Sequence, residues 1–277
     1  MLFLLPSIEM KLSIITISYN NAADLEQTIK SVISQTWTGF EYIIIDGGST
    51  DGSVELIAQY QDKLAFWVSE PDRGIYHAMN KGVQKANGDY LLMLNAGDFL
   101  CDREVLQRVF AATTHEEDLL LGDVHRTANG RIFQDSHYDA PLTFSFFRQT
   151  SISHQGTFIK RSLHETIGLY DEHLRFSSDW KFFVLAICKY NVSYKNLPFF
   201  VATCDCGGLT WDPRNFPAIK KEMAQVQQQH FPAFVDDYTH YEYLQSHTIK
   251  RRILAIWPNF KYIIKKKVLK REILGEN

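Results

Sequence analysis

Hydrophobic and polar residues alternate in blocks along the first 98 residues of the chain. Short, almost entirely apolar runs predict strands at Leu12–Ile17, Tyr42–Ile45, Leu64–Val68 and Tyr90–Leu94. The segments between them have apolar residues at helical spacing and predict helices at Ala23–Gln35, Ser53–Gln61 and Ile75–Ala86. Strands and helices that alternate in this way form parallel sheets with right-handed crossovers. We therefore expect a Rossmann-like α/β fold, with a mostly parallel central sheet and helices on both faces.

The pattern is less regular after Asp98. Strands are predicted at residues 119–122, 124–127, 131–134, 157–159 and 199–204, with Asn129-Gly130 as a hairpin turn. Helices are predicted at residues 142–147, 163–167, 180–190 and 217–229. We see no domain boundary in this mixed second half, so we expect it to extend the same sheet.

Composition and charge limit the classes of protein to which the chain can belong. The chain has 277 residues, 45% of them hydrophobic, which is ample for one large α/β domain. Its net charge of -3 argues against a general nucleic-acid-binding protein. The last 31 residues, His247–Asn277, hold nine Lys and Arg against two Glu, which is +7 and leaves -10 for the rest.

This basic tail has isoleucines at helical spacing between its lysines and arginines, with Trp257-Pro258 as a break. Such a segment predicts a helix that lies on an anionic membrane surface with Trp257 at the interface. The alternative is a helix that packs on the catalytic domain and keeps its basic face in solvent.

The cysteines and the N-terminus give no sign of export. The four cysteines form no CxxC pair, and Cys204-Asp205-Cys206 is too closely spaced to supply a zinc site alone. We expect reduced thiols and a cytoplasmic protein. No apolar run is long enough to span a bilayer, and Met1–Pro6 lacks the charged region and cleavage site of a signal peptide. Met10 is an alternative start.

Three acidic, glycine-containing turns directly follow predicted strands, at residues 46–51, 70–74 and 95–98. The carboxyl ends of parallel strands meet at one edge of a sheet, where open α/β sheets bind ligands. Carboxylates such as Asp46 and Asp98 suit Mg²⁺ or Mn²⁺, which in turn suits a diphosphate substrate. For one aspartate alone, a turn or helix cap would be the better interpretation. Three acidic turns in one strand series favour a binding site.

The phosphate-binding chemistry does not follow the common glycine-rich motifs. The chain has neither GxxxxGK[ST] nor GxGxxG, which argues against a P-loop kinase and a standard dinucleotide-binding fold. A metal and residues such as Arg73 would have to meet the phosphate charge. Arg73 lies at a turn before a helix, where it can reach a pyrophosphate; a solvated surface arginine is the alternative.

Two further polar clusters are candidates for catalysis. Asp179, at the start of a predicted helix, is a candidate general base or a helix N-cap. His154 and Gln155 precede the strand predicted at residues 157–159 and are candidates for binding acceptor or phosphate, although a lone histidine is more often structural.

Four segments in order resemble the family 2 glycosyltransferases, over about Lys11 to Thr210. They are Ser13–Asn20, Ile45–Gly52, Ser69–Gly82 and Asn95–Asp98. The third resembles a subgroup from exopolysaccharide gene clusters, including colanic-acid-type enzymes. The resemblance implies an A-type glycosyltransferase fold, a nucleotide-sugar donor and a divalent metal.

The same resemblance implies roles for individual residues. Asp179 matches the family's general base, which deprotonates an acceptor hydroxyl for in-line attack with inversion, and Asp98 matches the last acid of the metal-binding DxD turn. The donor-binding residues would be Thr16, Ser18, Asn20, Asp46, Ser49, Arg73, Asn80, Asn95 and Asp98. The acceptor-binding residues would be His154, Gln155 and Trp180.

The chain departs from the family pattern at several positions. Asn95 and Gly97 stand where many relatives have Asp, which leaves Asp98 as the only acid of its turn. Other frequent acids are replaced at Gly47, His77 and Ser178. The chain also lacks a QxxRW motif, so addition of a single sugar is favoured over processive synthesis. Residues 204–210 resemble the family's mobile loop over the acceptor.

We thus expect an inverting, non-processive transferase in surface polysaccharide synthesis, with a saccharide or lipid-diphosphate-linked acceptor, in the cytoplasm or at the inner face of the membrane. Its catalytic domain would cover residues 10–231, with a nucleotide-sugar half (10–98) and an acceptor half (99–231), and residues 232–277 would form the basic tail. One alternative is a nucleotidyltransferase acting on sugar phosphates, although Tyr19–Ala23 lacks its glycine-rich basic loop. Another is a non-catalytic nucleotide-sugar-binding protein.

Overall fold

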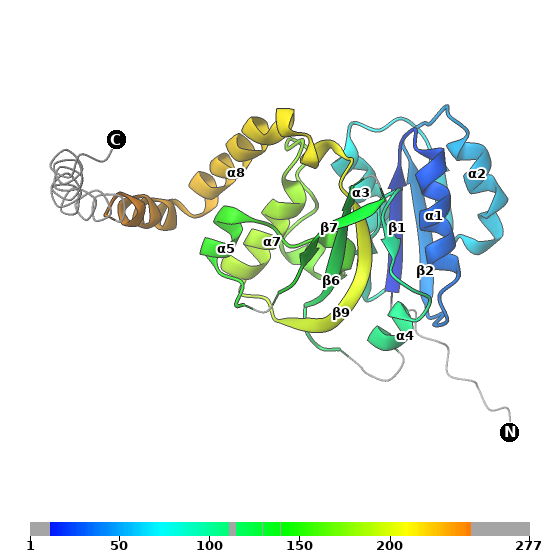
Figure 1. Ribbon diagram of the computed structural model, residues 1–277, viewed down its shortest axis with the longest axis horizontal. Helices are drawn as coiled ribbons and strands as arrows, with labels where there is room; N and C mark the ends of the chain where they lie inside the picture. Colours follow the sequence, from blue (N-terminus) through cyan, green and yellow to red (C-terminus); the bar gives the residue numbers. More distant parts are fainter. Residues whose placement is uncertain (1–11, 111–114, 129, 139, 245–277) are drawn as a thin grey trace, which may run out of the picture. The chain divides into compact units, whose positions relative to one another are not determined.

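A computed structural model describes residues 12–110, 115–128, 130–138 and 140–244 of the chain (Figure 1). It divides into two compact units, Met1–Ala224 and Gln225–Asn277. The first unit contains the sheet and the residues predicted for catalysis. In the second unit, residues 225–230 complete α8 (Phe216–His230) and residues 232–244 are helical. The basic segment from His247 onward lies outside the described residues, as do Met1–Pro6 and Met10.

The first half of the sheet is parallel. The strand β1 (Leu12–Ser18) pairs with β2 (Phe40–Asp46) on one side and with β4 (Tyr90–Met93) on the other, and β3 (Phe66–Ser69) pairs with β2. Every residue of β1 is buried, as expected for a strand covered on both faces. Ser18 lies opposite Asp46 in the register, so the carboxyl ends of these two strands meet.

Helices cover both faces of this half. Leu25 and Ile29 of α1 (Ala22–Ile33) join Ile14 in one core cluster, together with residues of α2 (Ser53–Gln59) and α4 (Val105–Phe110). The next residue of β1, Ile15, points to the opposite face. There it contacts Gly82 of α3 (Ile75–Lys85), where a Cβ would lie 2.3 Å from Ile15 Cγ2. A short 3-10 turn, η1 (Gln61–Lys63), leads into β3.

The second half extends the sheet with mostly antiparallel neighbours. The strand order is β3-β2-β1-β4-β8-β6-β9-β5, and β7 (Arg131–Ser136) pairs with β6 outside that path. The added strands are β5 (Phe99–Leu100), β6 (Leu119–Ala128), β8 (Thr157–Lys160) and β9 (Tyr194–Asp205). Of these contacts, β6 with β9 is parallel, and the two strands run side by side in Figure 1. The prediction of an α/β sheet with a parallel first half is confirmed.

The boundaries differ from the predicted ones in several places. The segments predicted as two strands, 119–122 and 124–127, form the single strand β6, whose register with β9 shifts on either side of Asp123. The sequence pattern gave no sign of β5 or α4, and β9 begins five residues earlier than predicted, at Tyr194. Gly130 of the predicted hairpin has a positive φ of 72°, whereas Asn129 lies outside the described residues.

The remaining helices follow β7 along the chain. They are α5 (Phe144–Gln149), η2 (His154–Gly156), α6 (Leu163–Thr166), α7 (Ser178–Cys188), η3 (Leu209–Trp211), η4 (Pro213–Asn215) and the first residues of α8. The helix α7 begins at Ser178, two residues before its predicted start, so Asp179 lies in its first turn.

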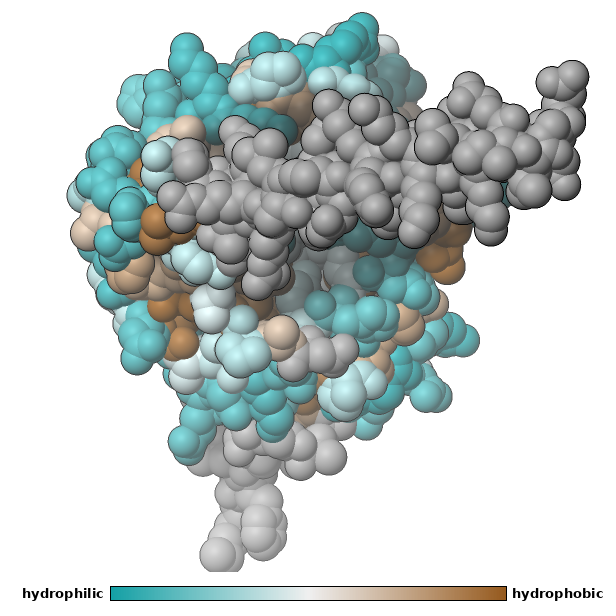
Figure 2. Space-filling model, turned by 60° about the vertical axis from the view of Figure 1, so that its left-hand side comes forward, coloured by the Kyte–Doolittle hydropathy of each residue, from teal (hydrophilic) through white to brown (hydrophobic). Residues whose placement is uncertain are grey.

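The surface is mixed. On the face shown in Figure 2, the apolar residues of the described chain form separate patches between hydrophilic ones. Among the described residues, no helix combines the length and apolar character needed to cross a membrane.

Candidate active site

Asp98 lies just beyond the end of β4, in a buried position. Its side chain is 4% exposed, and its Oδ1 accepts a hydrogen bond from the backbone N–H of Asp205 at 3.1 Å. Burial raises the pKa of Asp98 to about 6, against the opposing charge of His154 and hydrogen bonds from Cys204, Asp205 and Gln155. Asp98 is therefore mostly ionised at neutral pH, with little solvent around it.

Asp46 holds the turn that follows β2. Its carboxylate accepts hydrogen bonds from the N–H groups of Gly48 and Ser49 and from the hydroxyls of Ser49 and Ser69, at 2.6 to 3.1 Å. In this arrangement Asp46 caps the turn, which was the alternative to ligand binding for a single aspartate. Asn20, with a positive φ of 49°, joins the same turn by donating its backbone N–H to Ser49 Oγ at 2.8 Å.

Two predicted donor-binding residues, Asn80 on α3 and Arg73 on the turn before it, contact the segment before α7. The amide of Asn80 exchanges hydrogen bonds with the backbone of Tyr170, at 2.9 Å in both directions, and donates to Glu172 at 3.1 Å. Arg73, which is 70% exposed, donates to Glu172 Oε2 at 2.6 Å. Thr16 is buried beside the Tyr42 hydroxyl at 2.9 Å. Their contacts with a donor stay predictions.

Ser18 and Asn95 are the predicted donor-binding residues with unsatisfied buried atoms. Ser18 Oγ and Asn95 Oδ1 have no hydrogen-bond partner among the described residues. Ser18 is the last residue of β1, and Asn95 lies just after the end of the adjacent strand β4. Buried polar atoms without partners are rare in proteins, so an oxygen- or nitrogen-rich ligand is expected at this edge.

Asp179 is held by residues from both halves of the first unit. Tyr76 of α3 donates its hydroxyl to Asp179 Oδ1 at 2.9 Å, and His154 Nδ1 lies 3.2 Å from Asp179 Oδ2. On its other side, His154 Nε2 lies 3.4 Å from Asn95 Nδ2. The structure thus brings Asp179, His154 and Asn95, which lie 25 and 59 residues apart, into one chain of contacts.

The electrostatics favour the ionised form of Asp179. Burial alone would raise its pKa, but the hydrogen bond and charge of His154 and the hydrogen bond from Tyr76 hold the pKa below its usual value. Burial would likewise lower the pKa of His154, but the carboxylates of Asp179 and Asp98 outweigh it and raise that pKa. Asp179 is therefore an oriented carboxylate, 21% exposed, that can accept a proton from a bound hydroxyl.

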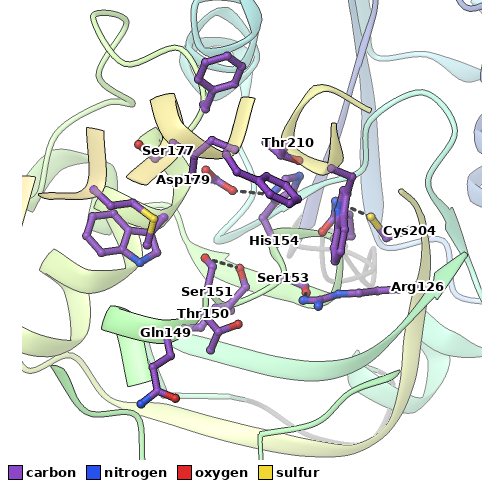
Figure 3. A pocket seen from close by; sticks show the side chains of 18 residues that line it. Arg126, Gln149, Thr150, Ser151, Ser153, His154, Ser177, Asp179, Cys204 and Thr210 are labelled. Atoms are coloured by element: carbon purple, nitrogen blue, oxygen red, sulfur yellow. Dashed lines mark hydrogen bonds and ion pairs between the residues drawn. The ribbon is translucent and has the colours of Figure 1, made fainter. Parts of the chain in front are cut away.

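A cavity of about 300 Å³ opens in front of Asp179 (Figure 3). Its lining includes the predicted acceptor residues His154, Gln155 and Trp180. Gln155 donates to Cys204 Sγ at 3.2 Å, and Trp180 donates its indole N–H to Phe147 O at 2.9 Å. Figure 3 shows Asp179 and His154 facing each other, and Arg126 reaching toward Ser153 from the other side of the cavity.

The residues around Asp98 suit a metal that arrives with its substrate. The described residues contain no group of three or more His, Cys, Asp and Glu placed to hold a metal ion. Asp98 and the unsatisfied Asn95 Oδ1 supply oxygen atoms at one edge of the sheet. Mg²⁺ is usually held by one or two carboxylates together with substrate phosphates, so this donor set fits such a metal.

Tyr76, Arg126 and Glu222 are near the candidate site but were not among the predicted site residues. Only Tyr76 had a sequence signal, because it lies in the 69–82 segment that carries the subgroup resemblance. Arg126 lies on a strand without a motif. Glu222 lies on α8, where its carboxylate accepts the N–H groups of three consecutive residues, 175–177, just before α7.

Comparisons with known proteins agree with this geometry. The family model described as Glycosyl transferase family 2 matches residues 13–180. An uncharacterised glycosyltransferase of Mycobacterium tuberculosis is 32% identical over 179 residues, which are 63% of this chain and 68% of the relative. A PGL/p-HBAD biosynthesis glycosyltransferase of Mycobacterium bovis is 35% identical over 178 residues, or 61% and 67% of the two chains.

Solved structures show the same fold. TarS of S. aureus, in complex with UDP-GlcNAc, has a TM-score of 0.62 and 20% identity, over 79% of this chain and 67% of that one. A mannosyltransferase of Pyrobaculum calidifontis, in complex with GDP-Man and Mn²⁺, has a TM-score of 0.54 and 17% identity, over 82% and 64%. The predicted A-type glycosyltransferase fold is confirmed.

Proposed function

The chain belongs to glycosyl transferase family 2, and from this premise we propose that it is an inverting, non-processive enzyme that transfers one sugar from a nucleotide-sugar to an acceptor hydroxyl. The orientation of Asp179 is the observation that carries the proposal. Both of its carboxylate oxygens have a hydrogen-bond partner, Tyr76 and His154, and the carboxylate borders the cavity that an acceptor would enter.

In this mechanism Asp179 accepts the proton of the acceptor hydroxyl as its oxygen attacks the anomeric carbon. The carbon–oxygen bond to the donor's diphosphate breaks on the opposite side, so the configuration inverts. Tyr76 and His154 keep the carboxylate ionised and fix its direction, which favours the near-attack geometry. The acceptor hydroxyl can use a free lone pair of the carboxylate, since each oxygen has more than one acceptor direction.

Asp98 and Asn95 would hold Mg²⁺ or Mn²⁺ together with the donor's diphosphate. A divalent cation bound there supplies charge stabilisation for the departing nucleoside diphosphate. The site that Asp98 forms with Asp205 N–H and Gln155 is buried, and low polarity strengthens electrostatic interactions there.

Likeness to known proteins supports a nucleotide-sugar as the donor. TarS binds UDP-GlcNAc and the Pyrobaculum mannosyltransferase binds GDP-Man with Mn²⁺. We extend the proposal to surface-glycan synthesis, with a saccharide or lipid-linked saccharide acceptor at the inner face of the membrane. Support comes from the 69–82 segment and from the relative in PGL/p-HBAD biosynthesis. The predicted domain limits, 10–231 and 232–277, are part of this proposal.

The test is a donor screen followed by two substitutions. UDP-, GDP- and dTDP-sugars with Mn²⁺ are screened for an increase in Tm, and the stabilising donor is then assayed for release of nucleoside diphosphate. Asp179→Asn should keep the donor-induced increase in Tm and lose about a thousandfold in turnover, because the general base is removed. Asp98→Asn should lose the Mn²⁺-dependent part of the donor effect.

Asp102→Asn is the matched control, because Asp102 is half exposed and pairs with Arg108 away from the cavity. It should leave donor binding and turnover unchanged. Wild-type turnover by Asp179→Asn, in a protein with native Tm, would show that Asp179 is not the base. A protein that no nucleotide-sugar stabilises would contradict the proposed function as a whole.

A further inference from the structure

One positively charged side chain, that of Arg126, lines the cavity in front of Asp179. Among the described residues that line it, Asp179 is the only acid and Arg126 is the only lysine or arginine. The carboxylate of Asp179 already has a partner at each oxygen, His154 at one and Tyr76 at the other. Asp123, on the same strand as Arg126, pairs with His137 at 2.9 Å. No described residue therefore forms an ion pair with Arg126.

The guanidinium of Arg126 is fixed in place but has free donors. It lies over the ring of Trp211, 5.1 Å from the ring centroid, in a cation–π contact. Its one hydrogen bond to a described residue goes from a terminal nitrogen to Ser153 Oγ, at 3.4 Å. A guanidinium has several N–H donors in a planar fork that matches a carboxylate or a phosphate. Trp211 and Ser153 thus position Arg126, and Ser153 uses only one of the arginine's N–H donors.

Arg126 and the proposed base contact consecutive residues. Ser153 accepts the hydrogen bond from Arg126, and the next residue, His154, contacts Asp179. Consecutive Cα atoms are about 3.8 Å apart, so the contacts of Ser153 with Arg126 and of His154 with Asp179 belong to one short stretch of the cavity lining. A ligand whose hydroxyl reaches Asp179 can therefore present another of its substituents to Arg126 in the same cavity.

Part of the cavity lining is apolar. Phe216, Ile219 and Met223 of α8 line it together with Phe176 and Trp180. Phe216 is 42% exposed, so part of this residue is open to a ligand in the cavity. A cavity that is lined by both apolar and polar side chains and contains one fixed cation selects ligands by charge as well as by shape.

We propose that the acceptor of this enzyme carries an anionic group, a carboxylate or a phosphate, on the accepting sugar or directly linked to it, and that Arg126 binds this group. The inference rests on the proposed transferase function, because it takes the cavity next to Asp179 as the acceptor site. Arg126 is then a specificity-determining residue, and Trp211 and Ser153 are positioning residues for it.

The test measures binding of three small probes by ligand-observed NMR titration of the full chain. Methyl β-D-glucuronide carries a carboxylate, α-D-glucose 1-phosphate carries a phosphate, and methyl β-D-glucoside is neutral. We expect at least one anionic probe to bind about tenfold more tightly than the glucoside, as for a charge-assisted pair. Which anionic probe binds more tightly distinguishes a sugar carboxylate from a phosphate.

Substitutions assign the preference to Arg126. Arg126→Gln should reduce the ratio of anionic to neutral affinity to about one and leave the affinity for the glucoside unchanged, whereas Arg126→Lys should keep part of the ratio. Arg131→Gln, on an exposed residue of β7 outside the cavity, should keep it all. Equal affinity for all three probes, including no detectable binding of any, would overturn the inference, as would an unchanged ratio in Arg126→Gln.

The acceptor inference and the transferase proposal can fail independently of each other. Donor-induced stabilisation and its loss in Asp98→Asn do not involve Arg126. A chain with normal donor behaviour but no anionic preference would refute only the acceptor inference. A chain with the anionic preference but no response to any nucleotide-sugar would refute the transferase proposal.

Discussion

Tyr76 donates its hydroxyl to Asp179 across 2.9 Å, although the two residues are 103 positions apart in the chain. His154 contacts the other carboxylate oxygen, so the proposed base is oriented by one residue from α3 and one from η2. Neither contact is needed to close a helix or a strand. The arrangement is therefore best explained by a requirement for a carboxylate in a fixed direction.

Removal of the Tyr76 hydroxyl should reduce turnover without changing donor binding. In Tyr76→Phe, Asp179 keeps its burial but loses one of its two side-chain hydrogen bonds. We expect kcat to fall about tenfold, the effect of one hydrogen bond to a charged group, with an unchanged KM for the donor. Tyr170→Phe is the matched control, because the Tyr170 ring lies 6.0 Å from that of Tyr76 and its hydroxyl has no partner among the described residues. Equal losses in both variants would contradict a specific role for Tyr76.

Glu222 should matter for both stability and turnover. Its carboxylate accepts three backbone N–H groups, at residues 175–177, and the hydroxyl of Ser177, at 2.7 to 3.1 Å. Glu222→Gln replaces one acceptor oxygen by a donor, so we expect a loss of about 1–3 kcal/mol in the free energy of unfolding and a lower kcat. Denaturant titration and turnover assays measure these effects. Glu165→Gln, at a 71% exposed glutamate, should change neither.

His164 makes the fold sensitive to mild acid. Burial lowers the pKa of His164 to about 4, whereas an unfolded histidine titrates near 6.5. As the pH falls from 6.5 to 4, the unfolded chain takes up a proton that the folded chain does not, and the fold loses about 3 kcal/mol. This contribution is fully present above pH 6.5.

The variant His164→Phe should remove most of that acid sensitivity. Phenylalanine keeps the ring contacts with Phe182 and Tyr170, whose centroids lie 4.6 and 5.2 Å away. Denaturant titrations at pH 7 and pH 5 measure the difference. His173→Gln, at an exposed histidine, should retain the wild-type slope, and an equally steep slope in His164→Phe would exclude His164 as the source.

Gly82 should tolerate no side chain. A Cβ there would lie 2.3 Å from Ile15 Cγ2, and Ile15 is fully buried in the central strand. Gly82→Ala would push α3 away from the sheet at a cost of about 1–3 kcal/mol, despite the higher helix propensity of alanine. Thermal unfolding measures this loss. Gly208→Ala is the control, since a Cβ at Gly208 meets nothing within 4 Å and should leave Tm unchanged.

The parts of the fold that sequence patterns predicted are those with strong local signals. The parallel strands of the first half are continuous apolar runs such as Tyr42–Ile45, because helices bury them on both faces. In contrast, β5 has two residues and α4 has six, too few for a periodicity to show. The long strand β6 was predicted as two strands, because Asp123 interrupts it at the position where the register shifts.

The same distinction holds for the site. Asp98, His154 and Asp179 were predicted because each stands in a recognisable segment at the end or start of an element. Tyr76 and Arg126 contact partners that lie 103 and 27 residues away, and local spacing contains no information about such contacts. Asp46 was predicted to contact the donor, and that contact stays a prediction; in the structure its carboxylate accepts hydrogen bonds from the turn that it caps.

The links that cross the first unit limit how such enzymes can be recombined. Tyr76 and Asp98 come from residues 10–98, the predicted donor half, and their partners Asp179 and Asp205 come from residues 99–231, the predicted acceptor half. A chimera that exchanges residues 10–98 with a relative would inherit one member of each pair from each parent. Donor preference should therefore be transplantable only when the partners at 179 and 205, with the backbone that presents them, match the incoming half.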